Sequence, residues 1–428
     1  MVTRQRALVL STSMSFIFWG IIGTIGPLVA SGAIIGSLGR NEEIIFLLVG
    51  PLTVPFGNLV MGILSDHFGR RKIFMFTMTF YTLGIIIISL SYSMLPLLIG
   101  LVLAEFGVGG EEPSSLALVG EETESKLRPK FLTLMTNYDN VGSAIMAGLF
   151  FIVVVNIQDR LVLLIGSLIL ISMMLYLRLY IPESKIWKKY RNNGTEISSN
   201  PSDAEYENVP ERTGKNDGNL RAEPQWISVS ESVEKRRPGH LLIFIFLGVI
   251  AVSQYLTFGL MAYVLAPIEF PGSFQDTLII FVAMCGASVA GFIAAPLISR
   301  GTKSYTLYSF LFGTATMVFI ITLTPVLSNM YIFLPLLFAN MFASEFAYAS
   351  RSVLEPELFG TKFRSTFIGI TRLWPMIAYP IFTFYTSYLN LRDFLLVNLI
   401  LWAMGFAATV VWYVYGIETK NMSLDYVS

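Results

Sequence analysis

The sequence predicts an all-helical membrane protein with twelve transmembrane helices in two pseudo-symmetric six-helix halves. Of its 428 residues, 54% are hydrophobic and only 14% are charged, whereas soluble domains carry about 25% charged residues. A membrane-spanning helix needs about 20 mostly apolar residues, and the chain contains twelve such runs. A polar stretch follows the sixth run and divides the chain into two halves.

The apolar runs, taken in order, are the expected helices. Before the polar stretch they cover residues 7–37, 43–64, 73–91, 95–119, 131–156 and 161–180. After it they cover residues 240–265, 277–298, 305–327, 331–353, 367–389 and 394–415. Each run is apolar nearly all round the helix, which is typical of a bundle in lipid. We therefore predict an N-terminal half at residues 1–184 and a C-terminal half at residues 239–428.

The polar stretch, residues 185–238, is expected to be a disordered cytoplasmic linker. It is rich in Asn, Ser, Glu, Pro and Gly and has too few apolar residues to form a core. It is also too short for an enzymatic domain.

The distribution of Lys and Arg predicts the orientation, because cytoplasmic loops carry an excess of these residues. With both termini inside, the short cytoplasmic segments hold Arg4, Arg6, Arg70, Arg71, Lys72, Lys126, Arg128, Lys130, Arg300, Lys303, Lys362, Arg364 and Lys420. The outside loops then hold only Arg40, Arg160 and Arg392. We therefore expect both termini in the cytoplasm. We also expect a monomer in the plasma membrane. The net charge is zero, which argues against nucleic acid as a partner.

A charged segment between the second and third runs has the spacing Gly-x-x-x-Asp-x-x-Gly-Arg-Arg-Lys and starts at Gly62. Gly62 lets two helices approach closely, and Gly69 permits a sharp turn. Asp66 can bind a basic partner or a helix N-terminus. A charged turn that only fixes topology is the alternative. The spacing resembles the loop between helices 2 and 3 of the major facilitator superfamily of transporters.

Three further segments resemble the sugar and metabolite porter branch of that superfamily. Residues 107–113 (Gly-Val-Gly-Gly-Glu-Glu-Pro), 182–184 (Pro-Glu-Ser) and 357–366 (Glu-Leu-Phe-Gly-Thr-Lys-Phe-Arg-Ser-Thr) carry the similarity. The resemblance implies the major facilitator fold, transport of a small molecule by alternating access, and no cofactor or metal. It also implies a cytoplasmic gate, whose candidates are Gly62, Asp66, Gly69, Arg70, Arg71, Glu121, Arg128, Glu357 and Arg364.

The halves also repeat some charged positions at an offset of about 234–236 residues. Glu121 precedes Arg128 by the same interval as Glu357 precedes Arg364, and Glu111 aligns with Glu345. Two related halves are what the superfamily's parallel repeat implies. The chain departs from the resemblance in helix 1, which carries no carboxylate, and in helix 5, which lacks the Gly-Pro signature of drug antiporters.

Ionisable residues inside the runs are the candidates for coupling to protons. A charge inside a span costs about 2.5–3.5 kcal/mol on insertion scales, so each ionisable residue in a span is expected to have a functional or a structural role. Glu105, Glu111 and Asp139 are candidate proton carriers, and hydrogen-bonded structural carboxylates are the alternative. Glu112 lies seven residues after Glu105, on nearly the same helical face, and is expected to be structural.

Other polar and aromatic residues inside the runs are candidates for binding the substrate, and structural packing is the alternative for each. They are Trp19, Asn137, Asn140, Gln254, Tyr255, Glu345, Tyr348, Arg372 and Trp374. Glu345 and Arg372 are expected at similar depth on consecutive antiparallel helices, so we predict that they form a salt bridge.

The sequence therefore predicts a secondary transporter of a small polar metabolite, a sugar or organic acid, by proton-coupled symport. An efflux antiporter for amphipathic compounds and a non-transporting membrane sensor are the alternatives. An enzyme is not expected, because the two histidines, His67 and His240, lie at helix ends and form no catalytic cluster.

Overall fold

The computed structural model describes residues 4–30, 39–152, 157–181, 183–189, 238–265, 269–270 and 272–422. In this part of the chain there are twelve long helices and no strand. The first six are α1 (Arg4–Ala30), α2 (Arg40–Phe68), α3 (Arg70–Leu90), α4 (Met94–Glu122), α5 (Arg128–Ile152) and α6 (Ile157–Leu179). The others are α9 (His240–Gly259), α11 (Ser273–Ile298), α12 (Thr302–Thr322), α13 (Met330–Leu358), α14 (Arg364–Thr386) and α15 (Leu391–Tyr415).

Three short segments complete the described structure: η1 (Leu260–Val264) extends α9, η2 (Thr324–Val326) follows α12, and η3 (Thr361–Phe363) precedes α14. Within the described residues, ten helices are long and apolar enough to cross a membrane. The two others are α5, which carries polar residues at its centre, and α6, whose apolar segment Leu164–Leu179 is shorter. The expectation of a twelve-helix membrane protein is confirmed.

Small residues on α4 bring its neighbours close. A β-carbon at Gly107 would lie 2.7 Å from the Tyr81 backbone nitrogen of α3, and one at Gly109 would lie 2.6 Å from the Val54 carbonyl oxygen of α2. Glycines in membrane helices permit such backbone contact. The glycine-rich segment of α4 thereby places the following residues, Glu111 and Glu112, at the centre of the bundle.

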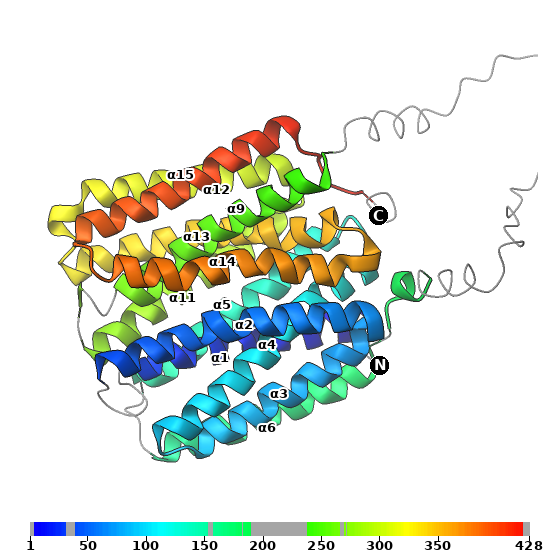
Figure 1. Ribbon diagram of the computed structural model, residues 1–428, viewed down its shortest axis with the longest axis horizontal. Helices are drawn as coiled ribbons and strands as arrows, with labels where there is room; N and C mark the ends of the chain where they lie inside the picture. The colour runs from blue at the N-terminus through cyan, green and yellow to red at the C-terminus, as the bar shows by residue number, and fades with distance from the viewer. Residues whose placement is uncertain are drawn as a thin grey trace, which may run out of the picture.

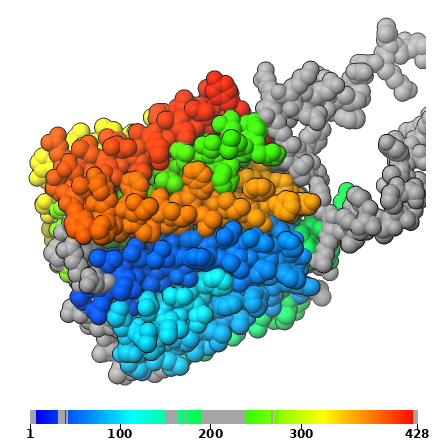
Figure 2. All heavy atoms as spheres, viewed as in Figure 1, coloured from blue at the N-terminus to red at the C-terminus, as the bar shows by residue number. Residues whose placement is uncertain are grey.

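The two halves meet along two pairs of helices. α14 packs along α2 on one side, and α5 packs along α11 on the other. Figure 1 shows the first pair side by side, and Figure 2 shows side chains of α2 and α14 in contact across this face. α1 begins and α15 ends at one end of the bundle. We call this the basic end; it holds the turns at Gly69, at residues 123–127 and at residues 359–363.

Several helices continue past the predicted boundaries at the basic end. α2 reaches Phe68, α4 reaches Glu122 and α13 reaches Leu358, although their apolar runs end earlier. Charged side chains in these last turns are buried in ion pairs, which allows the helices to continue. Most of the predicted linker, residues 190–237, and part of the first predicted run, residues 31–38, lie outside the described residues. Residues 185–189 form a helical turn.

Candidate functional site

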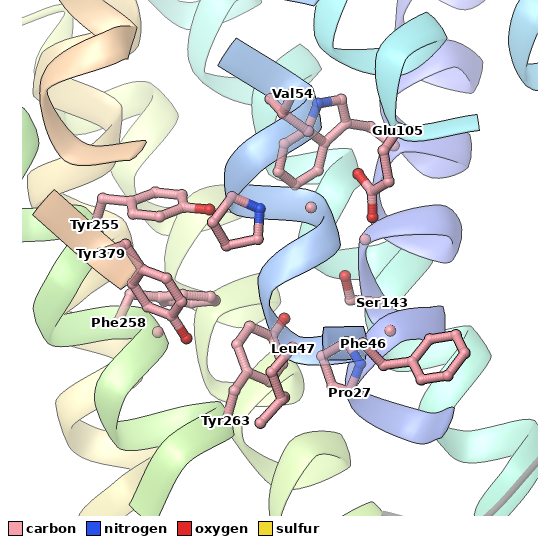
Figure 3. Close-up of a pocket in the computed structure, with 16 residues that line it drawn as sticks. Pro27, Phe46, Leu47, Val54, Glu105, Ser143, Tyr255, Phe258, Tyr263 and Tyr379 are labelled. Carbon is pink, nitrogen blue, oxygen red and sulfur yellow. The ribbon is translucent and has the colours of Figure 1, made fainter. Parts of the chain in front are cut away.

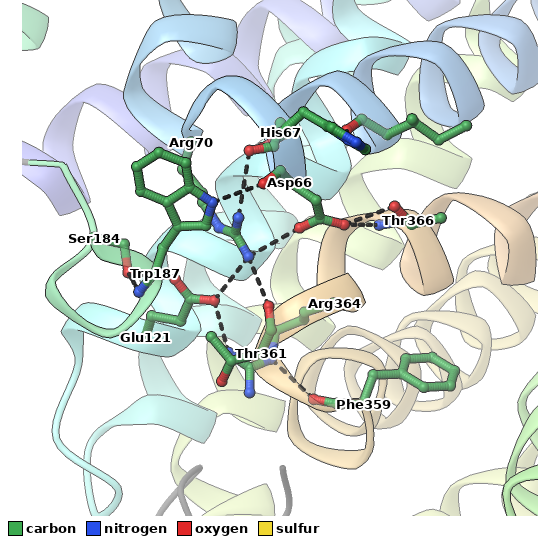
Figure 4. Close-up of polar contacts among 12 residues, drawn as sticks. Asp66, His67, Arg70, Glu121, Ser184, Trp187, Phe359, Thr361, Arg364 and Thr366 are labelled. Carbon is green, nitrogen blue, oxygen red and sulfur yellow. Dashed lines mark hydrogen bonds and ion pairs between the residues drawn. The ribbon is translucent and has the colours of Figure 1, made fainter. Parts of the chain in front are cut away.

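A buried network of charges closes the basic end (Figure 4). The Arg70 Nη2 atom lies 2.9 Å from Asp66 Oδ1 and 3.3 Å from Glu121 Oε1. On the other half, Arg364 Nη1 lies 2.7 Å from the same Glu121 oxygen. Glu121 therefore joins an arginine of α3 to an arginine of α14. Charge-assisted hydrogen bonds of this kind are roughly twice as strong as neutral ones.

Asp66 also contacts the first turn of α14 directly. Its Oδ2 accepts hydrogen bonds from the Thr366 backbone nitrogen at 2.8 Å and from the Thr366 hydroxyl at 2.7 Å. A carboxylate at a helix N-terminus is stabilised by the unpaired N–H groups and the helix dipole. A β-carbon at Gly62 would lie 2.8 Å from the Ser365 carbonyl oxygen, so glycine permits this close contact between α2 and α14.

A second ion pair joins the halves, with its arginine in the N-terminal half and its acid in the C-terminal half. Arg128 Nη1 of α5 lies 3.7 Å from Glu357 Oε1 of α13. Glu121 and Glu357 occupy equivalent positions in the repeat, as do Arg128 and Arg364. Each acid therefore pairs with the arginine of the other half. The repeat in the sequence thus corresponds to two equivalent ion pairs between the halves.

The turn between α2 and α3 is fixed by residues that follow α6. Gly69 has a φ of 108°, a conformation that favours glycine. The Arg71 backbone nitrogen donates to Glu183 Oε1 at 3.1 Å, and the Trp187 indole donates to the Asp66 carbonyl at 2.8 Å. All nine gate candidates thus lie at the basic end, and their role in gating stays a prediction.

Two adjoining cavities lie between the halves. The first has a volume of about 70 Å³ and is shown in Figure 3; the second has a volume of about 50 Å³. Trp19, Tyr255 and Phe258 line both, so one central site extends through the two.

The first cavity is rich in aromatic residues and contains one acid. Helices α1, α2, α4 and α5 line it from one half, and α9, η1 and α14 line it from the other. Its aromatic residues are Trp19, Phe46, Tyr255, Phe258, Tyr263 and Tyr379. Glu105 of α4 supplies the acid. The rest of the lining is glycine, proline, aliphatic residues and Ser143.

The second cavity is polar and lies next to a chain of buried ion pairs. Arg372 of α14 forms an ion pair with Glu112 of α4 and lies 2.8 Å from Glu355 Oε2 of α13. Glu355 also lies 3.0 Å from the Arg351 Nε atom. The Tyr348 hydroxyl donates to Glu112 at 3.1 Å. Glu112 therefore links the N-terminal half to the arginines of the C-terminal half.

The predicted salt bridge between Glu345 and Arg372 is wrong. Glu345 instead accepts a hydrogen bond from the Asn140 amide at 2.8 Å. The helix α13 continues to Leu358, five residues beyond the predicted run, so Glu345 lies about a turn and a half deeper than expected. Glu355, later on the same helix, contacts Arg372 in its place.

Several buried acceptors in the second cavity have no hydrogen-bond partner in the described structure. They are Asp139 Oδ1, Glu345 Oε1 and Glu112 Oε2, and the Trp19 indole nitrogen is a donor in the same situation. Buried polar atoms are usually hydrogen-bonded. These atoms are therefore available to a ligand or to water, and three of the four require a donor.

The structure brings most of the predicted binding residues together. The second cavity is lined by Trp19, Asn140, Gln254, Tyr255, Glu345, Tyr348 and Arg372, together with Asp139. Asn137 lies outside both linings and donates to the Ser288 carbonyl of α11 at 3.0 Å. Trp374 is also outside, is 38% exposed, and packs edge-on against Phe244.

Glu111 and Glu112 point to different sides of α4. Glu111 pairs with Arg178 of α6 and accepts from the Thr77 hydroxyl at 3.2 Å, away from both cavities. Glu112, which was expected to be structural, faces the second cavity. The spacing of seven residues from Glu105 was the signal for this orientation, because both residues line the central site. Phe258, Tyr379 and Glu355 were not predicted.

Comparisons with known proteins agree with this architecture. Residues 8–383 match the sequence profile of the Major Facilitator Superfamily. The proton:xylose symporter XylE has a similar structure, with a TM-score of 0.74, 14% identity, and coverage of 99% of this chain and 98% of that one. The human organic anion transporter MFSD10 gives a TM-score of 0.67, 13% identity, and coverage of 95% and 99%.

Curated relatives are similar over shorter regions. A putative niacin/nicotinamide transporter of Bacillus subtilis is 25% identical over 42% of this chain and 45% of its own length. The niacin transporter of Acinetobacter baylyi is 26% identical over 28% and 27%. Myo-inositol transporter 3 of Cryptococcus neoformans is 27% identical over 26% and 18%. These alignments span less than half of each relative. The family match covers most of the chain, and the protein belongs to the Major Facilitator Superfamily.

Proposed function

We propose that this protein is a proton-coupled secondary transporter that moves a small organic solute across the plasma membrane by alternating access. The observation that carries the proposal is the position of the central site: both halves line it, and at the basic end the hydrogen bonds of Asp66 to Thr366 and the ion pairs of Glu121 and Glu357 join the halves. Rocking the halves about such a site exposes it to either side of a membrane.

The chemistry of the second cavity favours a solute that donates hydrogen bonds. Three carboxylate oxygens in its lining accept no hydrogen bond, and its arginines, Arg351 and Arg372, already form ion pairs with Glu355 and Glu112. A sugar or polyol supplies such donors. An organic acid, the other predicted substrate, would have to compete with these carboxylates for the arginines. Relatives named as transporters of xylose, inositol and niacin support a small organic substrate.

Two acids in the central site are suited to carry protons. Glu105 and Asp139 line the cavities and have no cation within ion-pair distance in the described structure. Glu111 is less suited, because Arg178 occupies its carboxylate. A second candidate function is proton-driven antiport of amphipathic compounds, which the aromatic first cavity favours.

The proposal is tested by flux into proteoliposomes that contain the purified chain. Labelled xylose, myo-inositol, niacin and an aromatic quaternary ammonium are offered with and without an imposed pH gradient. We expect at least one solute to accumulate in a manner that collapses when a protonophore removes the gradient. Protein-free liposomes are the control. Equal entry of every solute into both preparations would contradict the transport function.

A further inference from the structure

The first cavity contains a buried carboxylate that no other side chain neutralises. Glu105 is 3% exposed and its carboxylate points into the cavity between Val54 and Ser143 (Figure 3). Within the described residues, no hydrogen bond or ion pair to this carboxylate is formed. A charge inside a membrane span is costly. Glu105 is therefore either protonated or paired with a cationic ligand.

Gly50, Val54 and Ser143 lie close to the Glu105 carboxylate, and aromatic rings line the opposite side of the cavity (Figure 3). The Tyr255 and Tyr379 rings meet edge to face with centroids 5.6 Å apart, and the Phe258 and Tyr263 rings do so at 6.1 Å. The face of an aromatic ring attracts a cation electrostatically, more strongly when water is excluded. The ring faces and the carboxylate thus both attract a positive charge.

The lining offers no positive charge to an anion and no amide group to a sugar. No Lys, Arg, His, Asn or Gln lines the first cavity. The nearest arginines are those of the second cavity, where Glu112 and Glu355 pair with them. Specific binding of a polyol or an acid needs several placed hydrogen-bonding groups. Here the polar groups are hydroxyls, one indole and one carboxylate.

We propose that the first cavity binds an organic cation, an amine or quaternary ammonium on an apolar body, with Glu105 as its counter-ion. This inference rests on the proposed transport function and specifies the substrate class of the same site. The carboxylate holds either a proton or the cation, so binding follows Glu–COOH + cation ⇌ Glu–COO⁻·cation + H⁺. The released proton gives the site a means of exchanging protons for cations.

The other titratable groups that face Glu105 are three tyrosines. Tyr255 of α9, Tyr263 of η1 and Tyr379 of α14 line the cavity, while the lining residues of α1, α2 and α5 carry no titratable side chain. In the neighbouring cavity lie Glu112, Asp139, Glu345, Tyr348, Arg351 and Arg372. A pH effect that disappears when Glu105 alone is replaced is therefore assigned to Glu105.

The test compares benzyltrimethylammonium with neopentylbenzene, its uncharged carbon isostere. Equilibrium binding is measured on the purified full chain in detergent for the wild type, Glu105→Gln and Glu105→Asp. We expect the wild type to prefer the ammonium at least tenfold, Glu105→Asp to keep a preference, and Glu105→Gln to lose it. Lower pH should weaken ammonium binding to the wild type and leave Glu105→Gln unaffected.

Folding of each variant is checked by gel filtration and thermal unfolding. Glu105→Gln removes a buried charge, so we expect its stability to be at least that of the wild type. A wild type without preference for the ammonium, or a Glu105→Gln variant that keeps it, would overturn the inference. Flux of another solute into proteoliposomes would then still support transport. Cation binding without flux of any solute would instead contradict the proposed transport function and still support the proposed cation-binding site.

Discussion

Arg372 balances the buried charges of the central site. It contacts carboxylates from both halves, Glu112 of α4 and Glu355 of α13, and it is 2% exposed. Removing one partner of a buried ion pair is strongly destabilising, because the remaining charge is left without compensation. A single guanidinium that serves two carboxylates should therefore be among the side chains on which folding depends most.

We predict that Arg372→Gln lowers the free energy of unfolding by about 3–5 kcal/mol. Thermal unfolding in detergent measures the effect. The matched control is Glu345→Gln, since Glu345 is equally buried and only accepts from the Asn140 amide; we expect a much smaller change. Equal losses in the two variants would show that the charge cluster around Arg372 has no special role.

At the scale of elements, two helix N-termini are capped by acids from outside the helix. Glu183, which follows α6, accepts from the Arg71 backbone nitrogen in the first turn of α3. Glu418, which follows α15, accepts from the Thr302 and Lys303 backbone nitrogens of α12 at 2.8 and 3.1 Å. The same contact thus recurs in both halves, and in each it connects the last helix of the half to the third.

Glu418 makes this contact dependent on pH. Partial burial alone would raise the pKa of Glu418, but hydrogen bonds from Thr302, Lys303 and Lys420 outweigh it and hold the pKa below the ordinary value of 4.5. A carboxyl whose pKa is lowered on folding stabilises the fold above its unfolded pKa, and this contribution is lost as pH falls through the folded pKa.

We therefore predict that Glu418→Gln reduces stability by about 1 kcal/mol near neutral pH, the usual size of a lost helix cap. The difference from the wild type should vanish as pH falls below 4.5. Thermal unfolding over a pH series measures it, with the exposed Glu124→Gln as control. A difference that persists in acid would mean that the carboxylate charge is not what stabilises the turn.

The sequence predicted elements better than contacts. Length and hydropathy sufficed for the helices, and the spacing from Gly62 to Lys72 located the turn whose charges join the halves. The ion-pair partner of Arg372 could not be predicted. Glu345 and Glu355 lie on one helix, and the position at which this helix ends determines which of them reaches Arg372. Of the aromatic lining, Trp19 and Tyr255 were predicted, but Phe258 and Tyr379 were not, because an aromatic residue in an apolar run has the same pattern whether it faces lipid or a cavity.

At the scale of the whole molecule, the structure is closed at one end and hollow at its centre. The contacts of the predicted gate lie at the basic end, where Asp66 contacts the first turn of α14 and Glu121 joins Arg70 to Arg364. The aromatic cavity extends from the centre along α2 and α9 towards the other end. Weakening the gate should therefore open the basic end and close the opposite one, if the halves rock about the central site.

Spin-label distances across the α2–α14 contact test this claim most directly. One label pair replaces Phe68 and Phe363 at the basic end, and another replaces Ile45 and Tyr385 at the opposite end; all four side chains are exposed. In Asp66→Asn, which weakens the contact with Thr366, the account predicts a longer distance for the first pair and a shorter distance for the second. Unchanged distances, or two distances that lengthen together, would contradict alternating access.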